Sequence, residues 1–217
     1  MIVAAGRGDR LGADRPKAFA RLAGRPLLAE SLERLELSGW VDSIVVVAPP
    51  GWEEPAILLA EELGAGKVVA CVTGGDTRVD SVRAGVAEVA DDAAVILVHD
   101  AARPLVSEAV LERVLAPLAE GWDGVVPALP VSDTIKRVRG DAVVETLPRA
   151  ELAAVQTPQG FVAPVLQAAL VGADDASDCA SLVEAAGGRV RIVEGDRRLL
   201  KVTTPEDLAL VEAWLAE

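Results

Sequence analysis

The chain has 217 residues, 51% of them hydrophobic and 25% charged, and it carries a formal net charge of -13. This composition suits one globular domain over residues 1–217, and the negative charge argues against nucleic acid or an anionic membrane as a partner. No apolar run reaches the roughly 18 residues that span a bilayer, and the start of the chain lacks a signal-peptide pattern. The two cysteines form no CxxC motif. We therefore expect a cytoplasmic protein with reduced thiols.

Apolar runs alternate with segments of helical period along most of the chain. In chain order the pattern predicts strands at residues 2–4, 43–48, 67–72, 94–98, 124–127, 189–193 and 199–202, and helices at 26–37, 53–63, 77–89, 107–120, 163–171 and 181–186. Thr77, Ser107 and Thr204 are expected to cap helices, and Pro205 follows the last of them. Strands separated by helices of about a dozen residues are typical of right-handed βαβ units. The sequence therefore predicts a three-layer α/β/α fold with a mostly parallel, Rossmann-like twisted sheet.

Residues 130–157 break this alternation. They hold two strand-like runs on either side of Gly140, which predicts a protruding β-hairpin arm at about residues 130–152. An isolated hairpin is only marginally stable in water. We therefore expect the arm to pack on another surface, and a second copy of the chain is one candidate.

A glycine-rich loop follows the first predicted strand. It covers residues 4–12, and Pro16 and Lys17 come soon after it. Small residues let the backbone approach a ligand, and consecutive amide groups can form an anion-binding nest. The loop lacks the Gly-Lys-Ser/Thr of a Walker A loop, and the second strand ends in Ala-Pro-Pro at 48–50 rather than in the acid of a dinucleotide fold. Arg10 and Lys17 could neutralise phosphates, so the loop favours a nucleoside triphosphate over a tight turn with surface cations.

Two further loops follow predicted strands, where ligands bind such sheets. After the strand at 67–72, two glycines precede Asp76, which could bind a base or a ribose with Ser81 one helical turn further on. A plain turn before a helix is the alternative. Asp100 stands directly after the buried strand at 94–98, a position and residue type that suit Mg²⁺. The only histidine, His99, is expected to be structural.

The last candidate segment contains Lys201, within the strand expected at 199–202. Lysine is scarce in this chain, whereas arginine is common. A lysine in such a strand suggests a need for its compact charge, and a snorkelling edge lysine is the alternative.

These motifs together resemble one family. AAGRGDRLG, RPK, GGDTRVDSV, LVHDAARP, VSDTIKR, TPQ and LKVTTPEDLAL occur in this order from residue 4 to about residue 210, and they are similar to those of the 2-C-methyl-D-erythritol 4-phosphate cytidylyltransferases of the non-mevalonate isoprenoid pathway. The resemblance implies transfer of a cytidylyl group from CTP to methylerythritol phosphate with release of pyrophosphate, and it implies Mg²⁺ as the cofactor.

The resemblance also implies a role for each matching residue. Arg10 and Lys17 would act on the triphosphate and the transition state, while Arg149 and Lys201 would orient the acceptor phosphate. The other implied residues are Ala4, Ala5, Gly6, Gly8, Gly75, Asp76, Ser81 and Ala101 for the nucleotide, Asp100 for Mg²⁺, and Arg103, Thr134, Thr157 and Ser177 for the acceptor. In the family the arm crosses to the partner subunit of a homodimer, so Thr134 and Arg149 would serve the neighbour's site.

The chain departs from the family pattern at two places. Cys179 stands in Ser-Asp-Cys-Ala-Ser at 177–181, where the family usually has an acid, and Val3 replaces the proline before Ala-Ala-Gly. Ribitol 5-phosphate cytidylyltransferases share much of the pattern and are an alternative. A sugar-1-phosphate nucleotidyltransferase and a non-catalytic nucleotide-binding protein are further alternatives. The joint presence of Arg10, Lys17, Asp100 and Lys201 argues against the last.

Overall fold

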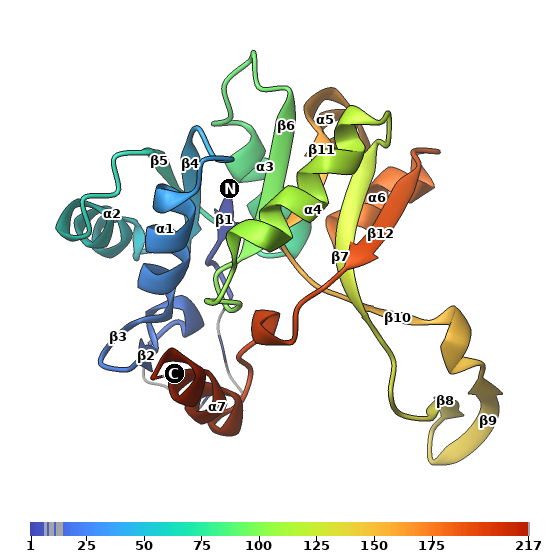
Figure 1. The fold of residues 1–217 in the computed structure, drawn as a ribbon. Coiled ribbons are helices and arrows are strands. Elements are labelled where there is room, and N and C mark those ends of the chain that lie inside the picture. The colour runs from blue at the N-terminus through green and yellow to red at the C-terminus, as the bar shows by residue number, and fades with distance from the viewer. Residues whose placement is uncertain (7, 9–10, 12–14, 217) are drawn as a thin grey trace.

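The computed structural model describes every residue except 7, 9–10, 12–14 and 217, so the predicted site residue Arg10 lies outside the described residues. The centre of the molecule is a mixed sheet of eight strands in the order β10-β7-β11-β6-β1-β4-β5, with β12 also pairing with β7 (Figure 1). The strands are β1 (Ile2–Val3), β4 (Ile44–Ala48), β5 (Val68–Thr73), β6 (Val95–Asp100), β7 (Gly124–Pro130), β10 (Ala153–Val155), β11 (Gln159–Val162) and β12 (Val190–Glu194). The β1, β4, β5 and β6 strands pair in parallel, as does β12 with β7.

Helices cover both faces of this sheet. On one face α1 (Leu27–Leu37), α2 (Glu53–Glu62) and α4 (Glu108–Ala119) share a hydrophobic cluster with the strands. On the other face α3 (Arg78–Val86), α5 (Ala163–Leu170) and α6 (Cys179–Ala185) form a second cluster. The predicted three-layer fold with a mostly parallel sheet is therefore confirmed. None of the helices in the described part of the chain is long and apolar enough to cross a membrane.

A third, smaller cluster joins the two ends of the chain. The last helix, α7 (Pro205–Leu215), packs against the ribbon of β2 (Arg21–Leu22) and β3 (Arg25–Pro26). Its Val211 is buried in a cluster with Leu11 of the glycine-rich loop and with Val202. The C-terminal segment thus lies beside the loop that follows β1.

The predicted caps are confirmed at two of three helices. Thr77 Oγ1 accepts the Asp80 backbone N–H at 3.0 Å at the start of α3, and Thr204 forms a reciprocal capping box with Asp207 before Pro205. Ser107 occupies the N-cap of α4, but its side chain accepts no capping hydrogen bond. The helix predicted at 181–186 begins earlier, at Cys179, because Asp178 accepts the Ser181 backbone N–H and caps it.

The strand predicted at 199–202 is wrong. Residues 197–199 form the 3-10 helix η4 (Arg197–Leu199), and Lys201 lies on the irregular segment after it. The apolar residues Leu199 and Val202 of this segment are fully buried against the rest of the molecule, although the segment does not join the sheet. Conversely, β11 was missed. It lies antiparallel between β6 and β7 and contains Gln159 and Gly160, which do not resemble a strand core.

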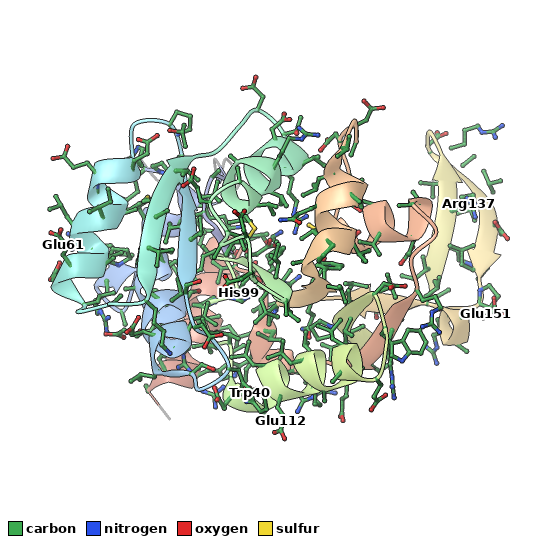
Figure 2. The ribbon with its side chains drawn as sticks, turned by 90° about the horizontal axis from the view of Figure 1, so that it is seen from above. Trp40, Glu61, His99, Glu112, Arg137 and Glu151 are labelled. Carbon is green, nitrogen blue, oxygen red and sulfur yellow. The ribbon has the colours of Figure 1, made fainter. Side chains whose placement is uncertain are left out.

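The predicted hairpin arm is confirmed. It consists of β8 (Ile135–Arg139) and β9 (Ala142–Leu147), which turn at Gly140 with a φ of 61°. The arm projects from the body of the molecule (Figure 1). Figure 2 likewise places Arg137 and Glu151 at one end of the molecule, far from His99 in its middle.

Candidate functional site

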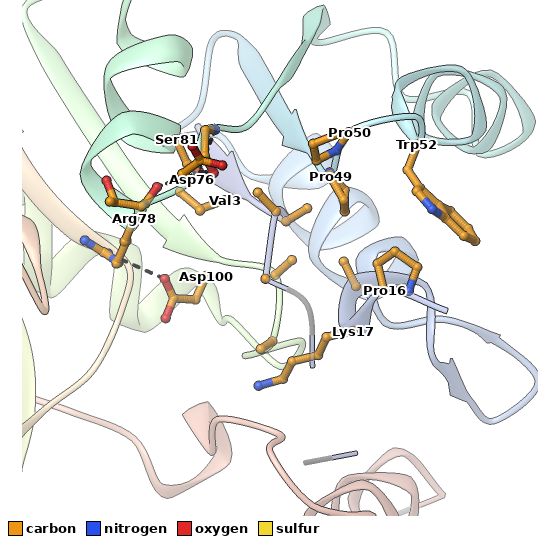
Figure 3. Close-up of a pocket in the computed structure, with 18 of the residues that line it drawn as sticks. Val3, Pro16, Lys17, Pro49, Pro50, Trp52, Asp76, Arg78, Ser81 and Asp100 are labelled. Carbon is orange, nitrogen blue, oxygen red and sulfur yellow. Dashed lines mark hydrogen bonds and ion pairs between the residues drawn. The ribbon is translucent and has the colours of Figure 1, made fainter. Parts of the chain in front are cut away.

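A cavity of about 670 Å³ opens beyond the carboxyl ends of β1, β4 and β6. This is the edge of the sheet where open α/β folds bind ligands, and the volume is that of a small-molecule site. Figure 3 shows its walls. The lining residues are Val3, Ala4, Ala5, Gly6, Arg15, Pro16, Lys17, Ala18, Pro49, Pro50, Trp52, Gly75, Asp76, Thr77, Arg78, Ser81, Asp100, Ala101, Ala102 and Lys201.

Most of the residues predicted for the nucleotide meet in this cavity with the predicted metal ligand, Asp100, and with Lys201, which was predicted for the acceptor phosphate. Those that line it are Ala4, Ala5, Gly6, Lys17, Gly75, Asp76, Ser81, Asp100, Ala101 and Lys201. They come from five separate segments, which the parallel strand order and the C-terminal segment bring to one edge of the sheet. The convergence that the loop positions predicted is therefore present in one chain.

The glycine-rich loop packs directly on Lys17. Gly8 has a φ of 78°, and a Cβ atom there would stand 2.6 Å from the Cβ of Lys17, so only glycine permits this approach. Lys17 begins the 3-10 helix η2 (Lys17–Phe19) and extends its side chain along the cavity (Figure 3). The side chain of Lys17 thus brings an ammonium group to the cavity.

A second wall, adjoining the glycine-rich loop, is the turn between β5 and α3. The Gly74 N–H donates to Ala48 O at 2.8 Å, and a Cβ atom on Gly74 would collide with the side chain of Ala5. Ser81 Oγ lies within hydrogen-bond distance of Gly75 N at 3.2 Å and donates to Thr77 O at 3.0 Å. These bonds present peptide groups and Asp76 to the cavity, which suits a flat polar ligand such as a base with its ribose.

Asp100 lies between two cations at the end of β6. Its Oδ2 is 2.7 Å from Lys201 Nζ, and its Oδ1 is 3.5 Å from Arg78 Nη2. Burial alone would raise the pKa of this carboxyl, but attraction to Lys201 and Arg78 outweighs burial and lowers the pKa to about 2. Asp100 is therefore ionised at neutral pH and presents a fixed negative charge to the cavity.

A buried hydrogen-bond network holds the backbone of Asp100 in place. Thr157 Oγ1 accepts the Asp100 backbone N–H at 3.0 Å and lies 3.3 Å from His99 Nδ1. His99 Nε2 is 3.1 Å from Arg103 O, and since a carbonyl only accepts, Nε2 carries the proton and Nδ1 accepts from Thr157. Burial lowers the pKa of His99 to about 4, so the imidazole is neutral and structural, as expected.

Thr157 and Arg103 thus support the cavity rather than line it. Arg103 Nη1 donates to Leu199 O at 2.6 Å, which ties the segment that carries Lys201 to the loop after β6. Both residues were predicted to hold the acceptor, and the structure places them behind Asp100 and Lys201.

Three other predicted acceptor residues lie away from the cavity. Thr134 and Arg149 belong to the arm region, where Arg149 Nη1 donates to Ser132 O at 2.6 Å. Ser177 is exposed on the loop before α6. A single chain therefore assembles the nucleotide side of the predicted site and leaves these groups elsewhere.

The structure adds cavity residues that the sequence reasoning missed. Arg78 directly follows Gly-Gly-Asp-Thr at the start of α3. This position in the sequence could have identified it as a cavity residue. Arg15 and Pro16 adjoin Lys17 and could have been included for the same reason. Trp52 had no such signal, because it reaches the cavity only through its packing on Phe19, with ring centroids 4.6 Å apart.

The possible metal-ligating side chains of the cavity suit a metal ion that is bound together with the phosphate groups of a ligand. Among the described residues, no group of three or more histidine, cysteine, aspartate or glutamate side chains could hold a metal ion. Mg²⁺ commonly takes one or two carboxylates and fills its other positions with phosphate oxygens and water. Asp100, ionised at the cavity wall, fits that pattern.

Comparisons with known proteins point in the same direction. The family model described as IspD, 2-C-methyl-D-erythritol 4-phosphate cytidylyltransferase, matches residues 1–217. A protein of that name from Nocardia farcinica is 48% identical over 216 residues, which cover 99% of this chain and 92% of the relative. One from Rhodococcus jostii is 48% identical and covers 100% of this chain and 94% of its own length.

Solved structures agree with these relatives. The crystal structure of 2-C-methyl-D-erythritol 4-phosphate cytidylyltransferase from Thermus thermophilus superposes with a TM-score of 0.81 at 35% identity, over 100% of this chain and 98% of the other. A 4-diphosphocytidyl-2C-methyl-D-erythritol synthase from Anaerococcus prevotii gives a TM-score of 0.85 at 26% identity, over 100% of this chain and 96% of the other.

Proposed function

We propose a mechanism from the premise that the chain belongs to the 2-C-methyl-D-erythritol 4-phosphate cytidylyltransferase family. The chain transfers the cytidylyl group of CTP to 2-C-methyl-D-erythritol 4-phosphate, giving 4-diphosphocytidyl-2-C-methyl-D-erythritol and pyrophosphate. One observation carries the assignment of the site. The cavity brings together Asp100 with its two cations Arg78 and Lys201, the ammonium group of Lys17, and the peptide groups of the turn before α3.

In this proposal the nucleotide lies across the cavity. Cytosine and ribose contact the wall of Gly75, Asp76 and Ser81, and the triphosphate lies over the loop after β1 towards Lys17. Arg10, outside the described residues, is proposed as a second cation for the triphosphate. Small residues on both sides let peptide N–H groups reach the phosphates directly.

The reaction needs charge stabilisation more than proton transfer. A phosphate oxygen of the acceptor is already anionic, and it forms the new bond to the α-phosphorus as the bond to pyrophosphate breaks. Two polyanions must therefore approach each other, and negative charge grows on the leaving group. Lys17 and Lys201 can offset that charge where it develops. His99 is buried beneath Asp100 and lines no part of the cavity, which agrees with a step that uses no imidazole base.

Mg²⁺ dependence is part of the proposal. Asp100 would hold the metal as its carboxylate ligand, and Mg²⁺ when bound would withdraw charge from the triphosphate oxygens. Lys201 forms an ion pair with the Asp100 carboxylate. Lys201 would therefore connect the metal ligand with the acceptor side of the cavity. Arg78 keeps the carboxylate facing the cavity from the other side.

The acceptor side is proposed to be completed by a second chain. Thr134 directly precedes β8 and Arg149 follows β9, neither lines the cavity of its own chain, and the arm exposes Val138, Val143 and Val144. Exposed apolar side chains on a projecting hairpin favour contact with another protein surface. We propose a homodimer in which each arm brings these two residues to the partner's cavity.

The assay that tests the function is pyrophosphate release from CTP with each candidate acceptor. We expect release with 2-C-methyl-D-erythritol 4-phosphate and much less with ribitol 5-phosphate, and CTP to be preferred over the other nucleoside triphosphates. A preference for ribitol 5-phosphate would overturn the acceptor. Binding of CTP without turnover with any acceptor would support a non-catalytic nucleotide-binding protein instead.

We also propose that the reaction takes place in the cytoplasm. Both cysteines, Cys71 and Cys179, are free thiols, and unpaired cysteines are typical of a reducing compartment. Cell fractionation with an antibody to the chain tests this, and recovery in a secreted fraction would contradict it.

A further inference from the structure

Arg78 connects two parts of the molecule that are far apart in sequence. Its Nη2 lies 3.5 Å from Asp100 Oδ1, and its Nη1 donates to Cys179 Sγ at 3.3 Å. The guanidinium also lines the cavity (Figure 3), with its side chain 20% exposed. One side chain therefore links α6 to the carboxylate at the end of β6 and to the space that the nucleotide would fill.

Asp100 is held from both sides by this arrangement. Arg78 approaches one carboxylate oxygen from α3, and Lys201 approaches the other from the C-terminal segment. Thr157 fixes the backbone N–H of the same residue. A carboxylate with each oxygen engaged by a different cation has little freedom to rotate, so Arg78 contributes to its direction as well as to its charge.

The partner at the other end of Arg78 is uncharged. Cys179 is 1% exposed, and burial raises the pKa of its thiol, so the sulfur accepts the hydrogen bond as a neutral group. The adjacent Asp178 directs its carboxylate elsewhere, to the Ser181 N–H and to Gln159 Nε2. Arg78, Asp100 and Lys201 together thus keep one positive charge in excess at this wall.

A carboxylate at position 179 would cancel that excess. It would also compete with Asp100 for the same guanidinium, because both ends of Arg78 would then face anions. We infer that Arg78 is a further positioning residue of the cytidylyl transfer, which orients Asp100 towards the metal-bound triphosphate, and that the neutral side chain at position 179 keeps the charge of Arg78 available to the nucleotide. The inference rests on the proposed use of Asp100 as the metal ligand.

The first experiment compares Arg78→Gln and Arg78→Lys with the wild-type chain. We expect Arg78→Gln to lower kcat by about tenfold to a hundredfold, as small misplacements of reacting groups do, and to raise the Mg²⁺ concentration that gives half-maximal rate. Arg78→Lys should recover only part of this loss, since one ammonium cannot span two partners as the planar guanidinium does. Arg83→Gln is the matched control, because Arg83 lies on the same helix and pairs with the surface residue Asp80.

The second experiment measures CTP binding without acceptor, by titration calorimetry with and without Mg²⁺. The matched pair is Cys179→Asp and Cys179→Asn, which have nearly the same shape and differ in charge. We expect the Kd for CTP to be about fivefold to tenfold weaker for the aspartate variant than for the asparagine variant, because a new negative charge near 4 Å offsets Arg78. Equal Kd values for the two variants would overturn the role given to position 179.

The outcomes separate this inference from the function on which it rests. If the wild-type chain does not convert CTP with any acceptor, the proposed function fails. If the wild-type chain is active and Arg78→Gln keeps its kcat, its Mg²⁺ dependence and its CTP affinity, Arg78 is only a structural ion pair and the inference alone fails. Should Arg78→Gln not fold, the Cys179 pair decides, since it leaves Arg78 in place.

Discussion

The cavity and the arm each contain a short ion pair, in different surroundings. In the cavity Lys201 Nζ is 2.7 Å from Asp100 Oδ2, and the Asp100 side chain is only 11% exposed. On the arm Arg137 Nε is 2.8 Å from Glu145 Oε2, and both side chains are at least half exposed. Solvent screens the arm pair, which contributes roughly 0–1 kcal/mol, whereas in the cavity two cations lower the pKa of Asp100 to about 2 against the opposing effect of burial. Two ion pairs of similar length therefore differ in interaction energy, because one is largely buried and the other is exposed to solvent.

The cavity and the arm also differ in whether a single chain can complete the part of the site to which they belong. The cavity draws its lining from six segments of a single chain and holds its charged residues with internal hydrogen bonds. The arm is a hairpin whose register shifts between Arg137 and Val138, and its exposed valines and the groups at its base are not part of the cavity lining. The nucleotide half of the site is thus an internal property of the fold, and the acceptor half is proposed to depend on assembly.

The largest expected effect is on the cavity side. We predict that Lys17→Ala lowers kcat by about 10²–10³-fold with the fold intact, since it removes one well-placed cation from the transition state. Steady-state pyrophosphate release measures the rate, and a thermal melt checks the fold. Lys67→Ala is the control, because Lys67 binds Ser38 O far from the cavity. A kcat close to that of the wild type would remove Lys17 from the mechanism.

The next prediction tests whether the arm completes a neighbour's cavity. Arg149→Ala and Lys17→Ala should each be nearly inactive alone, but a mixed dimer has one cavity with Lys17 and a partner arm with Arg149. After subunit exchange in equal amounts, we expect about a quarter of wild-type activity to return, as random pairing in a twofold dimer requires. Exchange confirmed by mass spectrometry without any return of activity would show that Arg149 serves its own chain. A monomer by light scattering with full activity would contradict the dimer itself.

Acid should destabilise the region under the cavity rather than the arm. The folded pKa of His99 is about 4, below its usual 6.5, so between these values the unfolded chain binds a proton that the folded chain does not. The contribution of His99 to stability is therefore complete above pH 6.5 and is lost as the pH drops to 4, by up to about 3 kcal/mol. Urea unfolding at pH 7 and pH 4.5 measures this loss. His99→Asn should flatten the dependence in this window, and an unchanged slope would assign it to other groups.

The smallest expected effect comes from two glycines, one in each region. Gly8 and Gly140 both have positive φ values, but a Cβ atom would meet Lys17 only at Gly8 and finds open space at Gly140. Alanine at either position should cost about 1 kcal/mol of unfolding free energy from backbone strain, and at Gly8 the clash with Lys17 adds to this cost. Only Gly8→Ala should also lower kcat, by about tenfold through displacement of Lys17. Equal kinetic effects of the two variants would mean that Gly8 does not position that lysine.

Much of the fold could be predicted from the sequence because the signals are local. The periodicity of α1, the cap and proline of α7 and the turn at Gly140 depend on residues within one element, and each of these predictions is confirmed. The strand expected at 199–202 failed for the opposite reason. Leu199 is buried in the first core cluster and Val202 in the cluster with α7, and burial alone does not distinguish a strand from a buried irregular segment.

The sequence by itself determined which residues carry charge and flexibility at the sheet edge. The glycines of the first loop, Lys17, and Asp100 after a buried strand were visible because strand ends and loops are read from neighbouring residues. Only the tertiary structure decided that Arg78 faces Asp100 and Cys179, that Lys201 completes the same group, and that Trp52 joins the cavity. Asp100 and Lys201, like Arg78 and Cys179, are 101 residues apart. Their meeting depends on how the helices and the C-terminal segment pack on the sheet, which local periodicity does not encode.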